Sequence, residues 1–191
     1  MIKTDKLWER YFDSKNKLNR FVVNRINWFL KNIDGNKILD IGCAEGLLIH
    51  LLSAKKTCVV YGVDICDKSI KIAIENNKDC VGKNVFLKTQ DAENLDYDNN
   101  FFDCVVMGEV LEHVNNQNIV LGHVKKVLKK FGTLLVSVPH NGKISANHKR
   151  SYNDITIKKI IESFGFVIHE LSFMDSGMSE NWILLKAVKY E

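Results

Sequence analysis

The segment 37–52, KILDIGCAEGLLIHLL, constrains this chain more than any other part of it. A short apolar run ends at Asp40, a turn of small residues follows from Gly42 to Gly46, and a helical pattern then begins. Glycine tolerates the backbone angles of a tight turn, and the amide groups that open a helix have no partners within it. The segment therefore predicts a strand, a turn and a helix that leave bare backbone open to a ligand.

The spacing of this turn disfavours a dinucleotide. The dinucleotide fingerprint requires glycines at the first, third and sixth positions. Counted from Gly42, this chain has Ala44 at the third position and Leu47 at the sixth. The carboxylate of Asp40, two residues before Gly42, would repel a pyrophosphate and suits a ligand that carries an ammonium group. A nicotinamide-dependent oxidoreductase is therefore disfavoured.

A second apolar run, 58–64, ends at Asp64, which follows Gly42 by 22 residues. An acid at the tip of the second strand, about 20 residues after the glycines, is placed to bind ribose hydroxyls. The alternative is that Asp64 caps the next helix, but Asp67 is better placed to do so. A third run, 85–90, is followed by Asp91, which could also be an ordinary turn residue.

The rest of the chain alternates between strand and helix patterns. Apolar runs predict strands near 37–41, 58–64, 85–90, 102–108, 133–138, 166–171 and 182–188, and helices near 13–32, 46–55, 67–77, 116–130 and 154–163. We expect Gly132 to end the helix 116–130 and Asp91 to Asn100 to form an acidic loop. A short polar loop joins the last two strands, which should therefore be antiparallel. This alternation predicts an α/β fold with a doubly wound, seven-stranded, mostly parallel sheet and a C-terminal antiparallel hairpin.

The motif Asp40-x-Gly42-x-Ala44-x-Gly46 resembles the first motif of class I S-adenosylmethionine-dependent methyltransferases, which commonly reads Asp-x-Gly-x-Gly-x-Gly. Ala44 is a departure from that pattern. The resemblance extends along nearly the whole chain and implies a single Rossmann-like methyltransferase domain over 1–191. It implies an N-terminal helical leader or lid over 1–35, with aromatic residues at Trp8, Tyr11 and Phe12, and a cofactor-binding core over 36–191. The residues that it implies for S-adenosylmethionine are Asp40, Gly42, Cys43, Ala44, Gly46, Asp64, Ile65, Asp91, Ala92 and Glu109, with Asp91 and Ala92 beside the adenine.

A second group of chemically useful residues follows the fourth predicted strand, in the segment GEVLEHV. If a helical turn begins there, Glu109, Glu112 and His113 share one face. Two carboxylates and an imidazole could accept a proton or hold a divalent metal. In many members of the family, a similar Glu-x-x-Glu-His segment binds no metal and shapes the floor of the substrate pocket. Glu109 is our preferred catalytic residue here because it follows the strand directly.

Two histidines after the fifth predicted strand, His140 and His148, should face the same cleft. Histidine is the natural base near neutral pH. We favour His148, because the segment HKRSY resembles the substrate-side loop of many small-molecule and sugar methyltransferases. It also resembles metal-dependent methyltransferases that modify the 2′-hydroxyl at RNA 3′ ends, in which two glutamates and two histidines bind the ion. The expected catalytic residues are thus Glu109, His113 and His148, and an ion held by Glu109, Glu112, His113 and His148 is the alternative.

These features predict an S-adenosylmethionine-dependent methyltransferase that acts on an oxygen of a small molecule or a saccharide. The absence of an Asn-Pro-Pro-Tyr-like segment after the fourth strand disfavours nucleobase or glutamine amides as acceptors. Methylation of the terminal ribose of RNA is the second choice, although such enzymes usually carry an RNA-binding extension. A catalytically silent, cofactor-binding subunit that serves a partner protein is the alternative from a different class.

Composition fits an intracellular enzyme of one domain. The chain has 191 residues, of which 46% are hydrophobic, and its net charge of +4 comes from scattered lysines and arginines that neither require nor exclude nucleic acid. Five cysteines without a Cys-x-x-Cys pair argue against a disulfide framework. The chain shows no apolar signal region and no run long enough to span a bilayer, so we expect a cytoplasmic protein without a membrane anchor. The sequence carries no signal for an oligomeric state.

Overall fold

The computed structural model describes residues 17–55, 57–143, 146–175 and 181–191. Its strands are β1 (Lys37–Ile41), β2 (Val59–Asp64), β3 (Val85–Thr89), β4 (Phe102–Gly108), β5 (Leu128–Pro139), β6 (Phe166–Asp175) and β7 (Asn181–Lys189). Its helices are α2 (Lys17–Asn32), α3 (Leu47–Ser53), α4 (Asp67–Asn76), α5 (Gln117–Val127), α6 (Asp154–Ser163) and the short 3₁₀ helix η1 (Ala92–Asn94). All seven predicted strands are present. The aromatic leader predicted at residues 7–12 lies outside the described residues.

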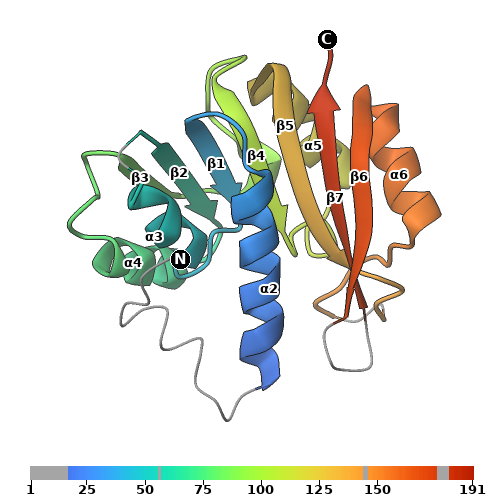
Figure 1. Ribbon diagram of the computed structural model, residues 1–191, viewed down its shortest axis with the longest axis horizontal. Coiled ribbons are helices and arrows are strands. Elements are labelled where there is room, and N and C mark those ends of the chain that lie inside the picture. Colours follow the sequence, from blue (N-terminus) through green and yellow to red (C-terminus); the bar gives the residue numbers. More distant parts are fainter. Residues whose placement is uncertain (1–16, 56, 144–145, 176–180) are drawn as a thin grey trace.

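The strands form one sheet in the order β3-β2-β1-β4-β5-β7-β6 (Figure 1). Strands β1 to β5 are parallel, whereas β7 is antiparallel to both β5 and β6. The order reverses at β1, because β2 and β3 lie on one side of it and β4 on the other. In such sheets, ligands bind beyond the carboxyl ends of the strands at the reversal. The predicted α/β sheet with a C-terminal antiparallel hairpin is therefore confirmed, and it fixes where a site should be sought.

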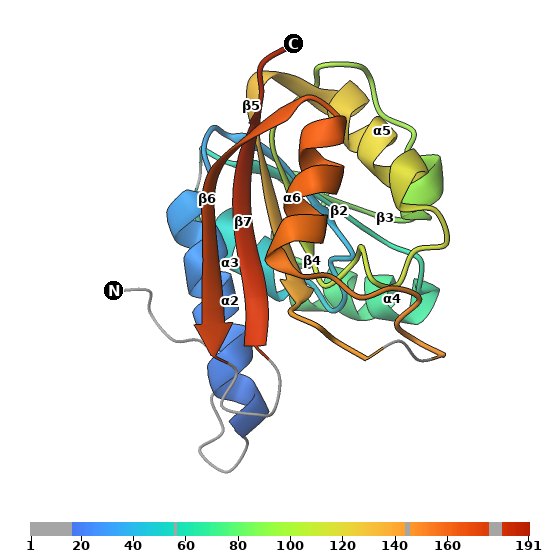
Figure 2. The same ribbon diagram turned by 90° about the vertical axis from the view of Figure 1, so that its right-hand side faces the viewer.

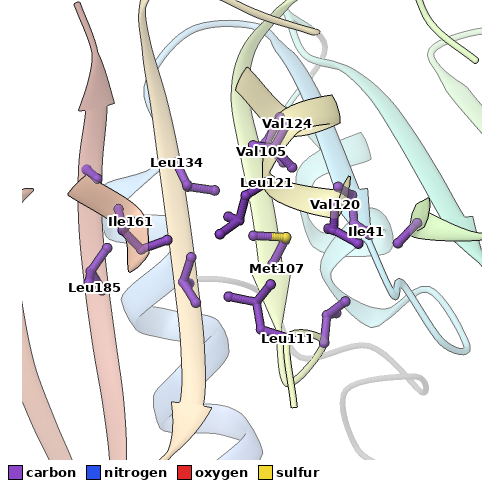
Figure 3. Packing of buried hydrophobic residues seen from close by; sticks show 14 of the residues in the cluster. Ile41, Val105, Met107, Leu111, Val120, Leu121, Val124, Leu134, Ile161 and Leu185 are labelled. Atoms are coloured by element: carbon purple, nitrogen blue, oxygen red, sulfur yellow. The ribbon is translucent and has the colours of Figure 1, made fainter. Parts of the chain in front are cut away.

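Helices cover both faces of the sheet (Figure 2). Buried residues of α2, α3 and α4, among them Ile26, Leu48 and Ile70, pack in one cluster with the inner strands. The opposite cluster joins α5 and α6 to the sheet, and Figure 3 shows Leu121 of α5 beside Met107 of β4, both fully buried. Because both faces are covered, the parallel strands are apolar along most of their length, which is why their runs were visible in the sequence.

The helix predicted over 116–130 was wrong at its end. Helix α5 stops at Val127, and β5 begins with the next residue. Gly132 lies inside the strand, beside a register shift between β4 and β5, and a Cβ atom there would lie 2.8 Å from the carbonyl oxygen of Lys129. Phe131 has a φ of 62°, so the chain forms a bulge there. The glycine accommodates that bulge and does not end the helix.

The predicted acidic loop from Asp91 to Asn100 contains the 3₁₀ helix η1. Among the described residues, no helix combines the length and the apolarity that crossing a membrane requires.

Packing of α5 against the sheet gives a first testable prediction. Leu121 is completely buried, so Leu121→Ala should lower the free energy of unfolding by about 2–5 kcal/mol through lost apolar contact and a cavity. Ile119 lies on the same helix with 44% of its surface exposed. Ile119→Ala should therefore change the free energy of unfolding by less than about 0.5 kcal/mol. Urea denaturation followed by circular dichroism measures both. Equal losses in the two variants would contradict this packing of α5.

Candidate active site

A cleft of about 510 Å³ opens at the carboxyl ends of the parallel strands, a size typical of small-molecule sites. Its wall is built by residues that follow β1, β2, β3, β4 and β5 and by one residue of α2. Most of the residues predicted to bind the cofactor lie on this wall: Gly42, Ala44, Asp64, Ile65, Asp91, Ala92 and Glu109. Asp40, Cys43 and Gly46 are buried and do not line it. The sheet thus gathers residues from five separate segments into one cavity.

The turn after β1 depends on positive φ angles. Gly42 has a φ of 73°, and a Cβ atom on it would lie 2.6 Å from a methyl carbon of Val110. Ala44 also has a positive φ, of 46°, which is uncommon for a residue with a side chain. Its amide N–H donates to the Asp64 carboxylate at 2.9 Å, and this bond holds the turn in its unusual conformation. The turn therefore presents backbone and small side chains to the cleft, as the sequence predicted.

The side chain of Asp64 links the carboxyl ends of β1 and β2 through hydrogen bonds. One carboxylate oxygen accepts the bond from Ala44, and the other accepts the amide N–H of Cys66 at 2.8 Å. Each carboxylate oxygen can accept a further hydrogen bond. Asp64 can therefore hold the turn and still accept bonds from a pair of ligand hydroxyls.

Asp40 lies beneath this turn with 6% of its surface exposed. Burial raises the pKa of Asp40 to about 7, the nearby Arg25 guanidinium lowers it, and the charge of Asp64 raises it further. Asp40 would therefore act on a ligand ammonium group through its electric field, since it does not line the cleft.

Arg25 is a site residue that the sequence interpretation missed. It projects from α2 to the cleft wall and forms an ion pair with Glu109, and its Nε has no hydrogen-bond partner among the described residues. Arg25 lies four residues from both Phe21 and Phe29, which are buried on the face of α2 that packs against the sheet. An arginine at helical spacing within such an apolar face was the available signal.

The segment after β4 is not helical, so the prediction that Glu109, Glu112 and His113 share a helical face was wrong. Glu109 has a φ of 59°, and its amide N–H donates to the carbonyl oxygen of Ser137 at 2.9 Å. The chain then forms one turn, closed by a bond of 2.9 Å from His113 N–H to the carbonyl oxygen of Val110. Glu109 consequently pairs with Arg25, while Glu112 lies elsewhere.

Glu112 belongs to a different group. Possible ligand atoms of Glu112, His113 and His148 all lie within 4.8 Å of one another, and Glu109 is not in this group. Glu112 is 1% exposed, and neither carboxylate oxygen meets a donor from another residue in the described part of the chain. Burial raises the pKa of Glu112 to about 8; its own amide and Arg25 lower it, and Glu109 raises it.

The two histidines of this group contact each other edge to face, with ring centroids 4.9 Å apart. Nδ1 of His113 lies 2.7 Å from the carbonyl oxygen of Asn147. A carbonyl oxygen only accepts, so Nδ1 carries the proton and Nε2 of the neutral ring is an acceptor. His140 lies instead against Phe173 of β6, with ring centroids 5.0 Å apart, and does not join the group.

A second set of bonds fixes the loop that carries His148. Arg150 donates to the carbonyl oxygens of Leu111 and Val114 at 2.9 and 2.5 Å, and the Lys149 amide donates to the carbonyl oxygen of Glu112 at 2.8 Å. Buried Tyr152 adds a hydroxyl bond to the Leu111 carbonyl. These residues hold the loop after β5 against the turn after β4, so the proximity of His113 and His148 is built into the backbone.

Gln90 was also missed by sequence reasoning. It lines the cleft just after β3; its Nε2 donates to the Asn94 carbonyl at 2.8 Å, and its buried Oε1 has no partner among the described residues. Asp91, which the resemblance placed beside adenine, accepts the amide of Glu93 at 2.9 Å and caps η1. Gln90 thus lines the cleft one residue before Asp91 and carries a buried acceptor without a partner among the described residues. Its place directly after the third strand was the available signal.

A family model described as "Methyltransferase domain" matches residues 32–175. Ubiquinone biosynthesis O-methyltransferase of Rattus norvegicus, a mitochondrial protein, is 34% identical over 118 residues, which cover 60% of this chain and 34% of the rat protein. The Coxiella burnetii (strain Dugway 5J108-111) protein of the same name is 33% identical over 105 residues, covering 55% of this chain and 44% of that protein. The chain therefore matches less than half the length of these curated relatives.

Solved structures share the fold. The cyclase SpnF superposes with a TM-score of 0.81 at 15% identity, covering 93% of this chain and 84% of that chain. Phosphoethanolamine N-methyltransferase 2 of Haemonchus contortus, in complex with S-adenosyl-L-methionine, has a TM-score of 0.74 at 19% identity, covering 88% of this chain and 53% of that chain. At such low identity these likenesses concern the fold alone.

The burial of Asp40 predicts a pH-dependent stability. The pKa of Asp40 is raised from 3.8 to about 7, so the folded protein binds the Asp40 proton more tightly than the unfolded chain does. The resulting stabilisation of the folded protein is complete below pH 3.8 and is lost as the pH rises through about 7. Asp40→Asn stays neutral, so at about pH 8.5 the variant should be more stable than the parent by on the order of 2–4 kcal/mol.

The measurement is the free energy of unfolding across this pH range without ligand. Asp98→Asn, at an exposed loop position, is the matched control and should follow the parent curve. A parent and an Asp40→Asn variant that lose stability in parallel would contradict the raised pKa of Asp40.

Proposed function

The chain belongs to the methyltransferase-domain family of class I S-adenosylmethionine-dependent methyltransferases, and we propose that it methylates a hydroxyl oxygen of a small molecule or saccharide. One observation carries the choice of oxygen: an imidazole pair, His113 and His148, meets at the wall of the cleft that contains the glycine turn. A hydroxyl acceptor must lose a proton during attack, and imidazole is suited to take it near neutral pH. The relatives named as ubiquinone biosynthesis O-methyltransferases support an oxygen acceptor.

The residues of the cleft fit the nucleoside part of S-adenosylmethionine. Asp64 has spare acceptor capacity for the two ribose hydroxyls, and the buried Oε1 of Gln90 is an unpaired acceptor for an exocyclic amine. Ile65, which follows Asp64, exposes 71% of its surface and offers an apolar face to a base. The backbone of Gly42 and Ala44 forms the floor between these points. We assign these residues to the nucleoside.

The charged residues beside the turn fit the amino-acid part. Arg25 has an unpaired Nε and can donate to a carboxylate, while Asp40 and Glu109 supply negative charge for an ammonium group and a sulfonium. In this proposal Glu109 holds Arg25 in place and contributes charge. The role of proton acceptor passes to the imidazoles, because the carboxylate of Glu109 is already in an ion pair.

S-adenosylmethionine supplies a methyl group made electrophilic by its sulfonium sulfur. The enzyme must chiefly bring the acceptor oxygen in line with that methyl carbon and exclude water. The acceptor oxygen forms the new O–C bond as the S–C bond breaks with its electron pair left on sulfur. The hydroxyl proton passes to Nε2 of His113, whose Nδ1–H is held by the Asn147 carbonyl. His148 packs edge to face against this ring and fixes its orientation.

Calorimetric titration with S-adenosylmethionine, followed by a radiolabelled methyl-transfer screen over phenols, saccharides, amines and short RNAs, tests the proposal. We expect binding and transfer to a phenol or saccharide hydroxyl. Transfer to the terminal ribose of RNA alone would favour the second choice named above. Binding without transfer to any acceptor would favour a silent subunit, and transfer to amines alone would overturn the choice of oxygen.

The imidazole pair gives a prediction about turnover. His113→Ala should lower kcat roughly 10²- to 10⁴-fold because proton removal from the acceptor is lost. The dissociation constant for S-adenosylmethionine should stay within about twofold, since the cofactor residues remain. His140→Gln is the matched control, because His140 lies against Phe173, and it should retain parental activity. Unchanged kcat in His113→Ala would refute the assignment.

Arg25 gives a prediction about cofactor recognition. Arg25→Gln should raise the dissociation constant for S-adenosylmethionine roughly 10- to 100-fold through loss of a charge-assisted bond to the carboxylate. Decarboxylated S-adenosylmethionine lacks that group, so its affinity should not fall in the variant. Lys31→Gln, at an exposed position on the same helix, controls for a general change of charge. If calorimetry shows that Arg25→Gln raises the dissociation constants of both ligands equally, Arg25 does not bind the carboxylate of S-adenosylmethionine.

A further inference from the structure

We propose that Lys149 and Asn115 bind an anionic group of the methyl acceptor, a carboxylate or a phosphate, and so select acidic small molecules. Both residues lie on the wall of the cleft that also carries His113. That the bound compound is the methyl acceptor rests on the proposed function, whereas the anion site itself requires no methyl transfer.

Lys149 carries a charge that no acid of the protein balances. Its side chain is exposed, and its Nζ donates to the side-chain oxygen of Asn115. Within the described part of the chain, no carboxylate forms an ion pair with it. Arg25, on the same wall, is by contrast paired with Glu109. An ammonium group has three N–H donors, so Lys149 has donors left for a ligand.

The side-chain amide of Asn115 supplies further donors beside this ammonium group. An ammonium group only donates, so the amide atom that Lys149 contacts is the oxygen, and the NH₂ group of Asn115 remains. That NH₂ group forms no hydrogen bond to any residue that the structure describes. The ammonium and the amide can therefore donate to two oxygens of one carboxylate or phosphate, and such charge-assisted bonds are the strong ones.

Hydrogen bonds from other segments hold both residues in place. The amide N–H of Asn115 donates to Oε1 of Glu93 at 2.6 Å, and its carbonyl oxygen accepts from Nη2 of Arg150 at 2.8 Å. The amide N–H of Lys149 donates to the carbonyl oxygen of Glu112 at 2.8 Å. The backbone of the pair is therefore fixed before a ligand arrives, which lowers the entropic cost of binding.

Two acids of the same wall are engaged with backbone amides. Oε1 of Glu93 accepts the amide N–H groups of both Asn115 and Asn116, and Asp91 accepts the amide N–H of Glu93. Neither acid forms an ion pair with Lys149 among the described residues. A bound anion would therefore supply the negative partner that Lys149 lacks.

The cofactor has no second anionic group for this pair. S-adenosylmethionine carries one carboxylate, which the proposed function assigns to Arg25, and its nucleoside is assigned to residues that follow β1, β2 and β3. Asn115 follows β4 and Lys149 follows β5, and His113 also follows β4. We therefore assign the anionic group to the molecule that brings its hydroxyl to His113.

One small molecule can reach both places. His113 and Asn115 are two residues apart along the chain, so their Cα atoms lie within about 7 Å of each other. An acidic acceptor gains charge-assisted hydrogen bonds from Lys149 and Asn115, whereas a neutral compound of the same shape does not. The pair would therefore select acceptors by charge and leave proton removal to His113.

Calorimetry on the full chain with saturating S-adenosylhomocysteine, which has no methyl group to transfer, tests the anion site. The probes are 4-hydroxyphenylacetate with its neutral amide, and glucose 6-phosphate with glucose. We expect the anionic member of at least one pair to bind roughly 10-fold more tightly than its neutral counterpart. The pair that responds distinguishes a carboxylate from a phosphate. Equal affinities within both pairs, or no binding of either anion, would overturn the site.

Substitutions assign the preference to the two residues. In Lys149→Gln the anionic and neutral affinities should come within about twofold of each other. Asn115→Asp should have the same effect, because the new carboxylate would pair with Lys149. Lys149→Arg should keep the preference, since a guanidinium also donates to these anions. Lys143→Gln is the matched control, because Lys143 is an exposed lysine of the same loop and does not line the cleft.

The same titrations contain the results that would contradict this assignment. A preference for the anion that Lys149→Gln leaves unchanged would overturn it. The dissociation constant for S-adenosylmethionine should stay within about twofold in each variant, which also checks that the variants fold. A larger rise in Lys149→Gln alone would assign this lysine to the cofactor and overturn the acceptor site.

The nature of the acceptor and the two kinds of failure are separated as follows. A short RNA whose binding is weakened by Lys149→Gln, with neither small anion bound, would replace the acidic small molecule by a nucleic acid and overturn the proposal. A preference for the anion that depends on Lys149, without product in the methyl-transfer screen, would reject the proposed function and keep the anion site. Methyl transfer to a neutral hydroxyl compound at equal rates in the parent and Lys149→Gln would keep the methyltransferase and reject selection by charge.

Discussion

The site depends on one topological constraint, the reversal of strand order at β1. Because β1 lies between β2 and β4 with all three parallel, their carboxyl ends meet at one edge. The amide N–H groups of Ala44 and Cys66 both donate to the Asp64 carboxylate and so tie the ends of β1 and β2 together. Without them, the positive φ of Ala44 would have no compensating partner. Fold and ligand surface are thus determined by the same few bonds.

Charge is distributed unequally around this edge. Asp40, Glu109 and Glu112 surround the guanidinium of Arg25, which pairs directly with only one of them. A ligand that brings an ammonium group and a sulfonium together with one carboxylate would balance this excess of acid. Burial disfavours the charged forms of Asp40 and Glu112 and is the main cause of their raised pKa values. Buried carboxyl groups therefore outnumber the guanidinium at this edge of the sheet.

The sequence predicted the sheet because strands buried on both faces are continuous apolar runs, and it predicted the turn because Gly42 and Gly46 mark positive φ angles. It failed where tertiary contacts override local patterns. The end of α5 depends on pairing of β5 with β4, and the Gly132 bulge looks in sequence like a helix terminus. Arg25 and Gln90 each had a sequence signal, but only the folded chain shows that both line the same cleft as the glycine turn.

The conformation of one residue decides how the Glu-x-x-Glu-His segment works. In a helix, Glu109 and Glu112 would lie on one face and could serve a single ion together. The positive φ of Glu109, held by its bond to the Ser137 carbonyl, turns the chain so that the two glutamates separate. One then neutralises Arg25 beside the glycine turn, and the other faces the histidines. The two glutamates of a five-residue motif thereby enter two different surroundings, one an ion pair on the cleft wall and the other a buried position beside two imidazoles.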